Sequence, residues 1–173
     1  MPQTPLELVA LNVARQREAV TRGTVDAALV RLPIDRAGLH VIPLYEEVPV
    51  VVCAADSHLT AAEELTLADL EGEVVIVPRD HVISVEVPGA VPAAFVPPGT
   101  TEEAVATVAA GVGVVIVPMS LARLHHRKDV DYRPLADGPP SPVALAWPAE
   151  GASALVDTFV GIVRGRTARS SRG

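Results

Sequence analysis

Residues 101–118, TEEAVATVAAGVGVVIVP, run from a helical pattern into a very apolar segment and hold the only G-x-G of the chain, at Gly111 and Gly113. In a dinucleotide-binding fold such glycines follow a strand and open a helix, so that the N-terminus of the helix faces the pyrophosphate. Here the helix comes first and the strand follows. We therefore expect Gly111 to end the helix in the left-handed conformation and Gly113 to turn the chain into the strand. The stretch favours an α/β fold and argues against a nucleotide-binding loop.

The helix of this stretch has a capping-box pattern at its start, Thr100 with Glu103. Residues 66–78, TLADLEGEVVIVP, echo the same order of cap, helix, glycine, β-branched strand and proline. The echo predicts two parallel strands that enter one sheet.

The remaining elements follow from hydrophobic period and from turn residues. Residues 6–11 are predicted as a short buried strand, Asn12 as the cap of a helix that ends at Gly23, and residues 25–30 as the next strand, which together would form a βαβ unit with two parallel strands. We expect further strands at residues 39–45, 48–55, 132–135 and 143–147, a short helix at 119–126, and loop through the five prolines of residues 78–98. A last helix at 153–163 is predicted to turn Leu155, Phe159 and Ile162 inward.

Composition sets limits on the class of protein. Of the 173 residues 49% are apolar but only 3% aromatic, so the core must consist of Val, Ala and Leu, as suits a buried parallel sheet covered by helices. The sequence has no apolar run of about 18 residues and no visible secretory signal, and the single cysteine, Cys53, fits a reducing cytoplasm. Residues 1–163 hold 10 of the 14 basic and all 21 acidic residues, a balance of −11 that argues against DNA binding by this body. The basic end, residues 164–173, is predicted to be a disordered tail.

The sequence does not point to an enzyme. It contains neither a Walker-type G-x-x-x-x-G-K nor a G-x-S-x-G elbow, and its five histidines lack the spacing of metal ligands. Cys53 lies in a Val-rich strand pattern and is read as an apolar filler. We therefore expect no catalytic residue, no metal and no cofactor.

A ligand cleft is the remaining kind of site. In open parallel sheets ligands bind beyond the carboxyl ends of strands, where loops and helix N-termini converge. Helix N-termini and two arginines in such places would suit a small carboxylate. The alternative for each residue is plain: a helix cap or a surface charge. The candidate effector-binding residues are Asn12, Val13, Arg31, Pro33, Pro78, Arg79, Thr100 and Thr101.

In order along the chain, several segments resemble the effector-binding domain of LysR-type transcriptional regulators. They are the helix–glycine–strand RGTVDAALV (residues 22–30), the crossover PLYEEVPVVV (43–52) with its later HL, and VAAGVGVVIVP (108–118). The resemblance extends from about Leu6 to Val163.

The resemblance implies a type 2 periplasmic-binding-protein-like fold. Lobe one would comprise about residues 1–43 and 137–163 and lobe two about 50–130, with a small, anionic effector held between the lobes. The candidate residues above match positions where this family contacts its effector. The expected function is a cytoplasmic, non-enzymatic effector-sensing domain of a transcriptional regulator; the alternatives are a degenerate domain that acts as an interaction or oligomerisation module, and a small α/β enzyme that uses the same cleft.

The chain departs from the family pattern in three ways. The N-terminal winged helix-turn-helix is absent from this sequence, so we expect no DNA binding by this chain alone. The first strand and helix of the domain are also absent before Leu6, and we expect a homo-oligomer or a partner chain to cover the resulting gap in lobe one. Residues 78–98 replace a longer segment, so lobe two should be smaller.

Overall fold

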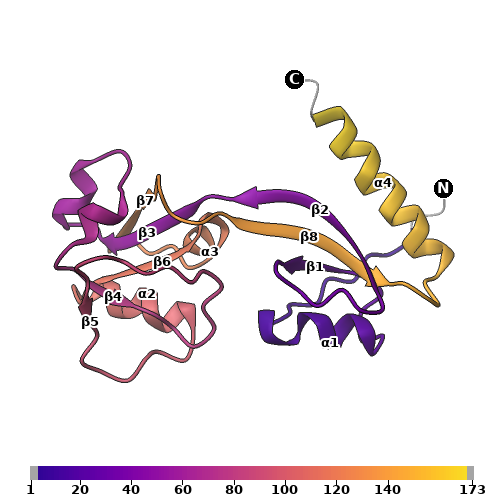
Figure 1. Ribbon diagram of the computed structural model, residues 1–173, viewed down its shortest axis with the longest axis horizontal. Coiled ribbons are helices and arrows are strands. Elements are labelled where there is room, and N and C mark those ends of the chain that lie inside the picture. The colour runs from indigo at the N-terminus through magenta and orange to yellow at the C-terminus, as the bar shows by residue number, and fades with distance from the viewer. Residues whose placement is uncertain (1–3, 171–173) are drawn as a thin grey trace. The chain divides into compact units, whose positions relative to one another are not determined.

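The computed structural model describes residues 4–170, with side chains described as far as residue 165. The chain divides into two units: unit 1 is Met1–Tyr45 with Val143–Gly173, and unit 2 is Glu46–Pro142 (Figure 1). The boundaries between the expected lobes lay at residues 43–50 and 130–137. The first observed boundary, between Tyr45 and Glu46, falls within its interval, and the second, between Pro142 and Val143, falls slightly after its interval. The α/β class with two sheets is confirmed.

Unit 1 is a three-stranded sheet with helices on its two faces. Its strands are β1 (Ala28–Arg31), β2 (Leu39–Glu47) and β8 (Ser141–Pro148), in the order β1-β8-β2. β1 is antiparallel to β8, with Ala28 opposite Ala146 and Arg31 opposite Val143. Its helical segments are the 3-10 turn η1 (Val13–Arg15), α1 (Gln16–Thr21) and α4 (Ala154–Ser170).

The alternation of side chains along β8 divides the core of unit 1 between these helices. Ala144 and Ala146 face the side of α1, where they pack with Val20 and Val30. The alternate residues of β8, Leu145 and Trp147, face α4. There they form a second cluster with Val156 and Val160.

The predicted strand at residues 6–11 is wrong. No strand forms there, and Leu6, Leu8 and Val9 are 70%, 86% and 52% exposed. A strand needs a hydrogen-bonding neighbour, and within the described residues the sheet provides none next to this segment. The predicted βαβ unit with two parallel strands is also wrong, because its first strand does not form and β1 pairs antiparallel with β8.

The last helix exists, and one of its three predicted inward residues is confirmed, because Phe159 packs against the cluster that contains Val156 and Val160. The other two are wrong, since Leu155 is 60% and Ile162 51% exposed. Apolar residues lie on more than one side of this helix. The side that carries Val156 and Val160, four residues apart, is buried because it packs against the side chains of β8. The backbone stays helical to Ser170, so the expected disordered tail is not seen over residues 164–170; residues 171–173 lie outside the described part.

Unit 2 is built on a mixed five-stranded sheet in the order β5-β4-β6-β3-β7. Its elements are β3 (Pro49–Ala54), the 3-10 turns η2 (His58–Ala61) and η3 (Leu67–Leu70), β4 (Val74–Ile76), β5 (Val91–Pro92), α2 (Thr101–Ala109), β6 (Val114–Pro118), α3 (Met119–Leu124) and β7 (Val130–Pro134). β4 is parallel to β5 and to β6, which confirms that the two echoing segments contribute parallel strands. The β6–β3 and β3–β7 pairs are antiparallel, so parallel pairing is less extensive than expected.

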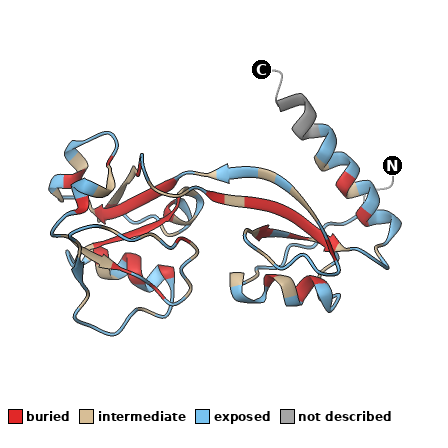
Figure 2. Cartoon of the chain, in the orientation of Figure 1, coloured by how far each residue is buried: buried red, intermediate tan, exposed pale blue. Residues whose placement is uncertain are grey.

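The strands β6 and β3 in the sheet of unit 2 are buried on both faces (Figure 2). Val50 and Val52 of β3 pack with α2 and α3, while Val51 and Cys53, which point the other way, pack under η2, η3 and the segment around Ile83. Residues 78–98 contain only the two-residue strand β5, as their prolines predicted.

The glycines of the opening stretch behave as expected. Gly111 follows the last turn of α2 with φ +84°, and Gly113 precedes β6 with φ +71°. A Cβ on Gly113 would collide with the backbone oxygen of Val74, so close contact between this turn and β4 adds a second requirement for glycine.

Candidate functional site

The candidates of unit 1 lie at the start of η1 and around the end of β1, and a buried glutamine joins these two places. The Asn12 side chain accepts a hydrogen bond from the Ala14 N–H at 2.9 Å, as expected of a cap. One turn later Gln16, only 7% exposed, donates from Nε2 to the Arg31 carbonyl at 2.8 Å and accepts from the Arg31 N–H at 2.9 Å. The helix start and the strand end are therefore held together by hydrogen bonds between the Gln16 side chain and the Arg31 backbone, and these bonds do not involve the Arg31 side chain.

The loop after β1 is fixed as well. The Leu32–Pro33 peptide bond is cis. Arg17 of α1 donates to the carbonyls of Asp35 and Ala37 and forms a 3.1 Å ion pair with the Asp35 carboxylate. Pro33 is exposed and Val13 half-buried, so both can be reached from solvent.

The candidates of unit 2 also come together, at the start of α2. The Arg79 N–H donates to the Pro98 carbonyl at 2.9 Å, and the Thr101 hydroxyl, 4% exposed as a residue, donates to Asp80 at 2.9 Å. The loop that follows β4 is thus attached to the first residues of α2. Pro78 begins this loop, and its carbonyl accepts from the His81 N–H and ring Nδ1.

The predicted capping box of α2 forms in a modified way. The Thr100 hydroxyl accepts from the Glu103 N–H at 3.2 Å, as expected, but the Glu103 carboxylate accepts from the Gly99 N–H at 2.6 Å. Three carboxylates therefore lie in or beside the first turn, those of Glu102, Glu103 and Asp80. They offset part of the positive end of the helix dipole.

The eight candidates thus form two groups, one in each unit: Asn12, Val13, Arg31 and Pro33 in unit 1, and Pro78, Arg79, Thr100 and Thr101 in unit 2. The residues that organise them, Gln16 and Asp80, were not among the candidates. For Gln16 a signal was present, because it stands on the apolar face of its helix between Val13 and Val20. A polar residue in that position needs a buried partner.

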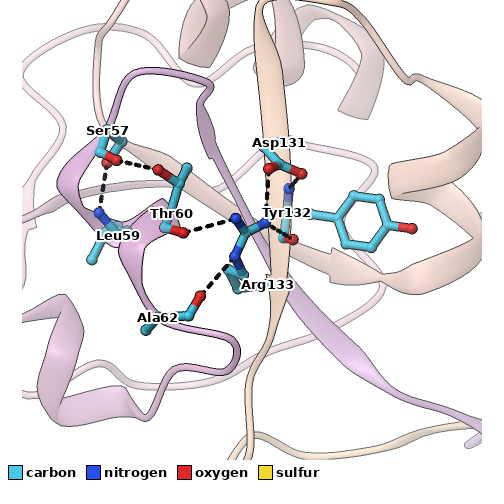
Figure 3. Close-up of polar contacts among 7 residues, drawn as sticks. All are labelled: Ser57, Leu59, Thr60, Ala62, Asp131, Tyr132 and Arg133. Atoms are coloured by element: carbon cyan, nitrogen blue, oxygen red, sulfur yellow. Dashed lines mark hydrogen bonds and ion pairs between the residues drawn. The ribbon is translucent and has the colours of Figure 1, made fainter.

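A polar cluster around Arg133 in unit 2 has a structural role (Figure 3). Arg133 donates to the carbonyls of Thr60 and Ala62 at 2.8 and 2.7 Å and to the Asp131 carboxylate at 2.8 Å. Burial raises the pKa of Asp131, but the hydrogen bonds from Arg133 and from the Tyr132 N–H outweigh it and leave that pKa below its usual range. The cluster fixes the turn η2 against β7.

The cysteine has the properties of a core residue. Cys53 is 1% exposed, and its burial raises the pKa of the thiol above the usual value even though the charge of Arg133 favours the thiolate. A buried thiol of high pKa is a poor nucleophile. Among the described residues, no group of three or more His, Cys, Asp or Glu side chains gathers as metal ligands would, and no helix has the length and apolar character needed to cross a bilayer.

Known proteins match the chain over almost its whole length. The family model described as the LysR substrate binding domain matches residues 1–168. The Hca operon transcriptional activator HcaR of Escherichia coli (strain K12) is 30% identical over 178 residues, which covers 96% of this chain and 60% of that protein. The HTH-type transcriptional regulator CatR of Pseudomonas putida is 33% identical over 160 residues, 82% of this chain and 52% of that protein. The chain therefore spans between half and two thirds of the length of these regulators.

Solved structures show the same fold. The oxidized form of OxyR superposes with a TM-score of 0.75 at 21% identity, covering 99% of this chain and 84% of that one. The BenM effector binding domain with its effector benzoate gives a TM-score of 0.72 at 22% identity, covering 96% and 80%. Because the family model matches nearly every residue, and an effector binding domain is among the structural neighbours, this chain belongs to the LysR substrate-binding-domain family.

Proposed function

We propose that this chain is the sensing part of a LysR-type transcriptional regulator and that it binds a small carboxylate effector through the two groups of candidate residues. One observation carries the proposal: in each unit a buried polar side chain attaches the start of a helix to a strand end or to the loop after it, Gln16 to the end of β1 and Thr101 to the loop after β4. Each unit thereby presents helix N–H groups beside a segment that carries an arginine, which is the chemistry that recognises carboxylates.

The relatives support the chemical class. HcaR and CatR are transcriptional regulators, and the BenM domain has benzoate, an aromatic carboxylate, as its effector. We infer a non-enzymatic role in the cytoplasm. We also infer that residues 1–163 do not contact DNA, because their formal balance of −11 would repel phosphates.

The test is a calorimetric titration of the purified chain with benzoate and with a panel of aromatic and aliphatic mono- and dicarboxylates. Monocarboxylates should bind, and Arg31→Ala and Arg79→Ala should each weaken binding by about tenfold, the loss of one charge-assisted contact. Arg22→Ala is the matched control, since Arg22 forms an exposed pair with Glu18 in unit 1. If no carboxylate binds, or if Arg22→Ala weakens binding as much as the other two, the proposed site is wrong.

A second role is favoured by the exposed apolar segment of unit 1. Leu6, Leu8 and Val9 lie open to solvent in succession, which marks a surface that another chain could cover. We propose that a second copy covers it, giving a homo-oligomer. Light scattering after size exclusion should show an oligomer that Leu8→Glu dissociates, whereas Leu124→Glu, at an exposed leucine of unit 2, should leave it intact. A wild-type monomer at high protein concentration would rule out this assembly.

A further inference from the structure

Unit 2 contains a hollow that is lined by only one of the candidate effector residues, Pro78. It has a volume of about 360 Å³ and lies at the end of β4, between β4, β6 and the irregular segment 81–86. Its walls are mainly aliphatic, with Val75, Val77, Ile83, Val85 and Ile116 among them. The volume falls in the lower part of the range of about 300–1,000 Å³ that is usual for small-molecule pockets. An α-helix, about 10 Å across with its side chains, would not fit.

The polar side chains of the hollow favour an uncharged occupant. Its wall includes His81, Ser84 and Glu86. The ring Nδ1 of His81 lies 2.9 Å from the Pro78 carbonyl, which can only accept, so Nδ1 is already engaged as a donor. A second anion would be repelled by the Glu86 carboxylate, and a cation would lose its hydration against aliphatic walls. A ligand with an apolar body and one hydroxyl group meets both conditions.

The hollow adjoins the candidate residues of unit 2. Pro78 and His81 line it, and they enclose the turn that carries Arg79. The same turn is attached to the start of α2, through the hydrogen bond from Thr101 to Asp80. A molecule in the hollow would therefore contact one side of a turn whose other side holds the proposed effector contacts.

We propose that this hollow is a second small-molecule site, which takes an uncharged apolar molecule with a single hydroxyl group and which is coupled to effector binding through the turn 78–81. The coupling rests on the proposed function; the site itself does not. Benzyl alcohol is a suitable probe because it has the ring of benzoate without the charge.

The test uses isoleucine methyl spectra of the intact chain. Of its six isoleucines, Ile76, Ile83 and Ile116 line the hollow, whereas Ile34 and Ile42 belong to unit 1. Benzyl alcohol should shift the first three methyl signals along a saturable curve and leave the last two unchanged. Shifts of similar size at all five methyls, or shifts that never saturate, would overturn the site.

A pair of tryptophan variants localises the effect. Ser84 lines the hollow and is exposed, so Ser84→Trp can block it without displacing a core residue. Ala106→Trp places the same side chain on the exposed side of α2 as a control. The saturable shifts should be lost in Ser84→Trp and retained in Ala106→Trp. Equal behaviour of the two variants would contradict the assignment.

The coupling is measured as a change in benzoate affinity. Saturating benzyl alcohol should change the dissociation constant of benzoate by about fivefold or more, the lower end of ordinary coupling energies. Ser84→Trp should abolish the change. An unchanged constant refutes the coupling. If benzoate and the other carboxylates do not bind at all, the proposed function fails while the methyl shifts still decide the site.

Discussion

The contact between Gln16 and Arg31 allows a quantitative prediction. In an antiparallel pair the N–H and C=O of one residue point to the same side of the strand, and at Arg31 both bond to the Gln16 side chain. The amide thus occupies the place of a neighbouring strand beside β1. We predict that Gln16→Met, which keeps the length of the side chain and removes its polar group, lowers the free energy of unfolding of unit 1 by about 2–4 kcal/mol.

This magnitude follows from the two backbone groups of Arg31 that lose their partner. Each backbone group left buried without a partner costs about 1–3 kcal/mol, so the two together give a range of about 2–6 kcal/mol. Gln16 is only 7% exposed, so water cannot easily replace it. Partial access of water after the substitution places the expected value in the lower half of the summed range.

The chain offers a convenient probe for this measurement. Its only tryptophan, Trp147, is 6% exposed in the core of unit 1, so its fluorescence during urea unfolding reports on that unit. Hydrogen exchange of the Arg31 amide should also accelerate, by roughly 30-fold or more. Glu18→Met, on the exposed side of α1, is the matched control and should change stability by less than about 0.5 kcal/mol. If Gln16→Met is as stable as this control and the Arg31 amide is equally protected, then Gln16 does not complete the edge of β1.

Three further predictions concern unit 2. Gly113→Ala should destabilise the protein in urea by well over 1 kcal/mol, because its Cβ would collide with Val74, whereas Gly111→Ala, with a similar φ and open space, should cost about 1 kcal/mol; equal effects would contradict the close-contact argument. Cys53, buried and with a raised pKa, should react with a thiol reagent at pH 8 far more slowly in the folded chain than in urea, and equal rates would show that the thiol is accessible. Asp69, whose pKa is lowered by hydrogen bonds at the start of η3, should stabilise the fold fully above the usual carboxyl pKa and lose this effect as pH falls through the lowered value; Asp69→Asn should therefore flatten the acid limb of stability, and an unchanged limb would refute the sign.

The sequence was most informative where structure depends on local signals. The order of helix, glycine and strand at residues 101–118 determined the positions of α2 and β6, and the echo at residues 66–78 correctly indicated a parallel neighbour, β4. Caps, left-handed glycines and prolines act within a few residues of themselves, so a single sequence displays them in full.

The errors concern pairing, which is not local. Residues 6–11 have a strand-like composition, yet a strand exists only beside another strand, and the sequence of the segment does not say whether one is there. The inward face of α4 was only partly right for a related reason: Phe159 packs inward, but Leu155 and Ile162 do not. Leu155 and Val156 are both apolar, and only the side chains of β8 decide which of them is buried.

The candidate residues show the same division. Asn12 and Thr100 were predicted as caps from their neighbours, and both form cap hydrogen bonds. That residue 31 would meet residue 16, or residue 80 residue 101, requires the tertiary fold. Whether the eight candidates bind an effector stays a prediction.

The two groups of candidates use related devices with different consequences for substitution. In unit 1, Gln16 bonds only to backbone groups of Arg31, so the side chain at position 31 can change without loosening the helix start. In unit 2, the Thr101 hydroxyl bonds to the side chain of Asp80, so a change at either position breaks the attachment. Residues 80 and 101 must therefore change together, or the start of α2 needs another bond to the loop after β4. If the proposed function is correct, effector selectivity in unit 2 should be easier to alter at Arg79, whose side chain takes no part in that bond, than at Thr101.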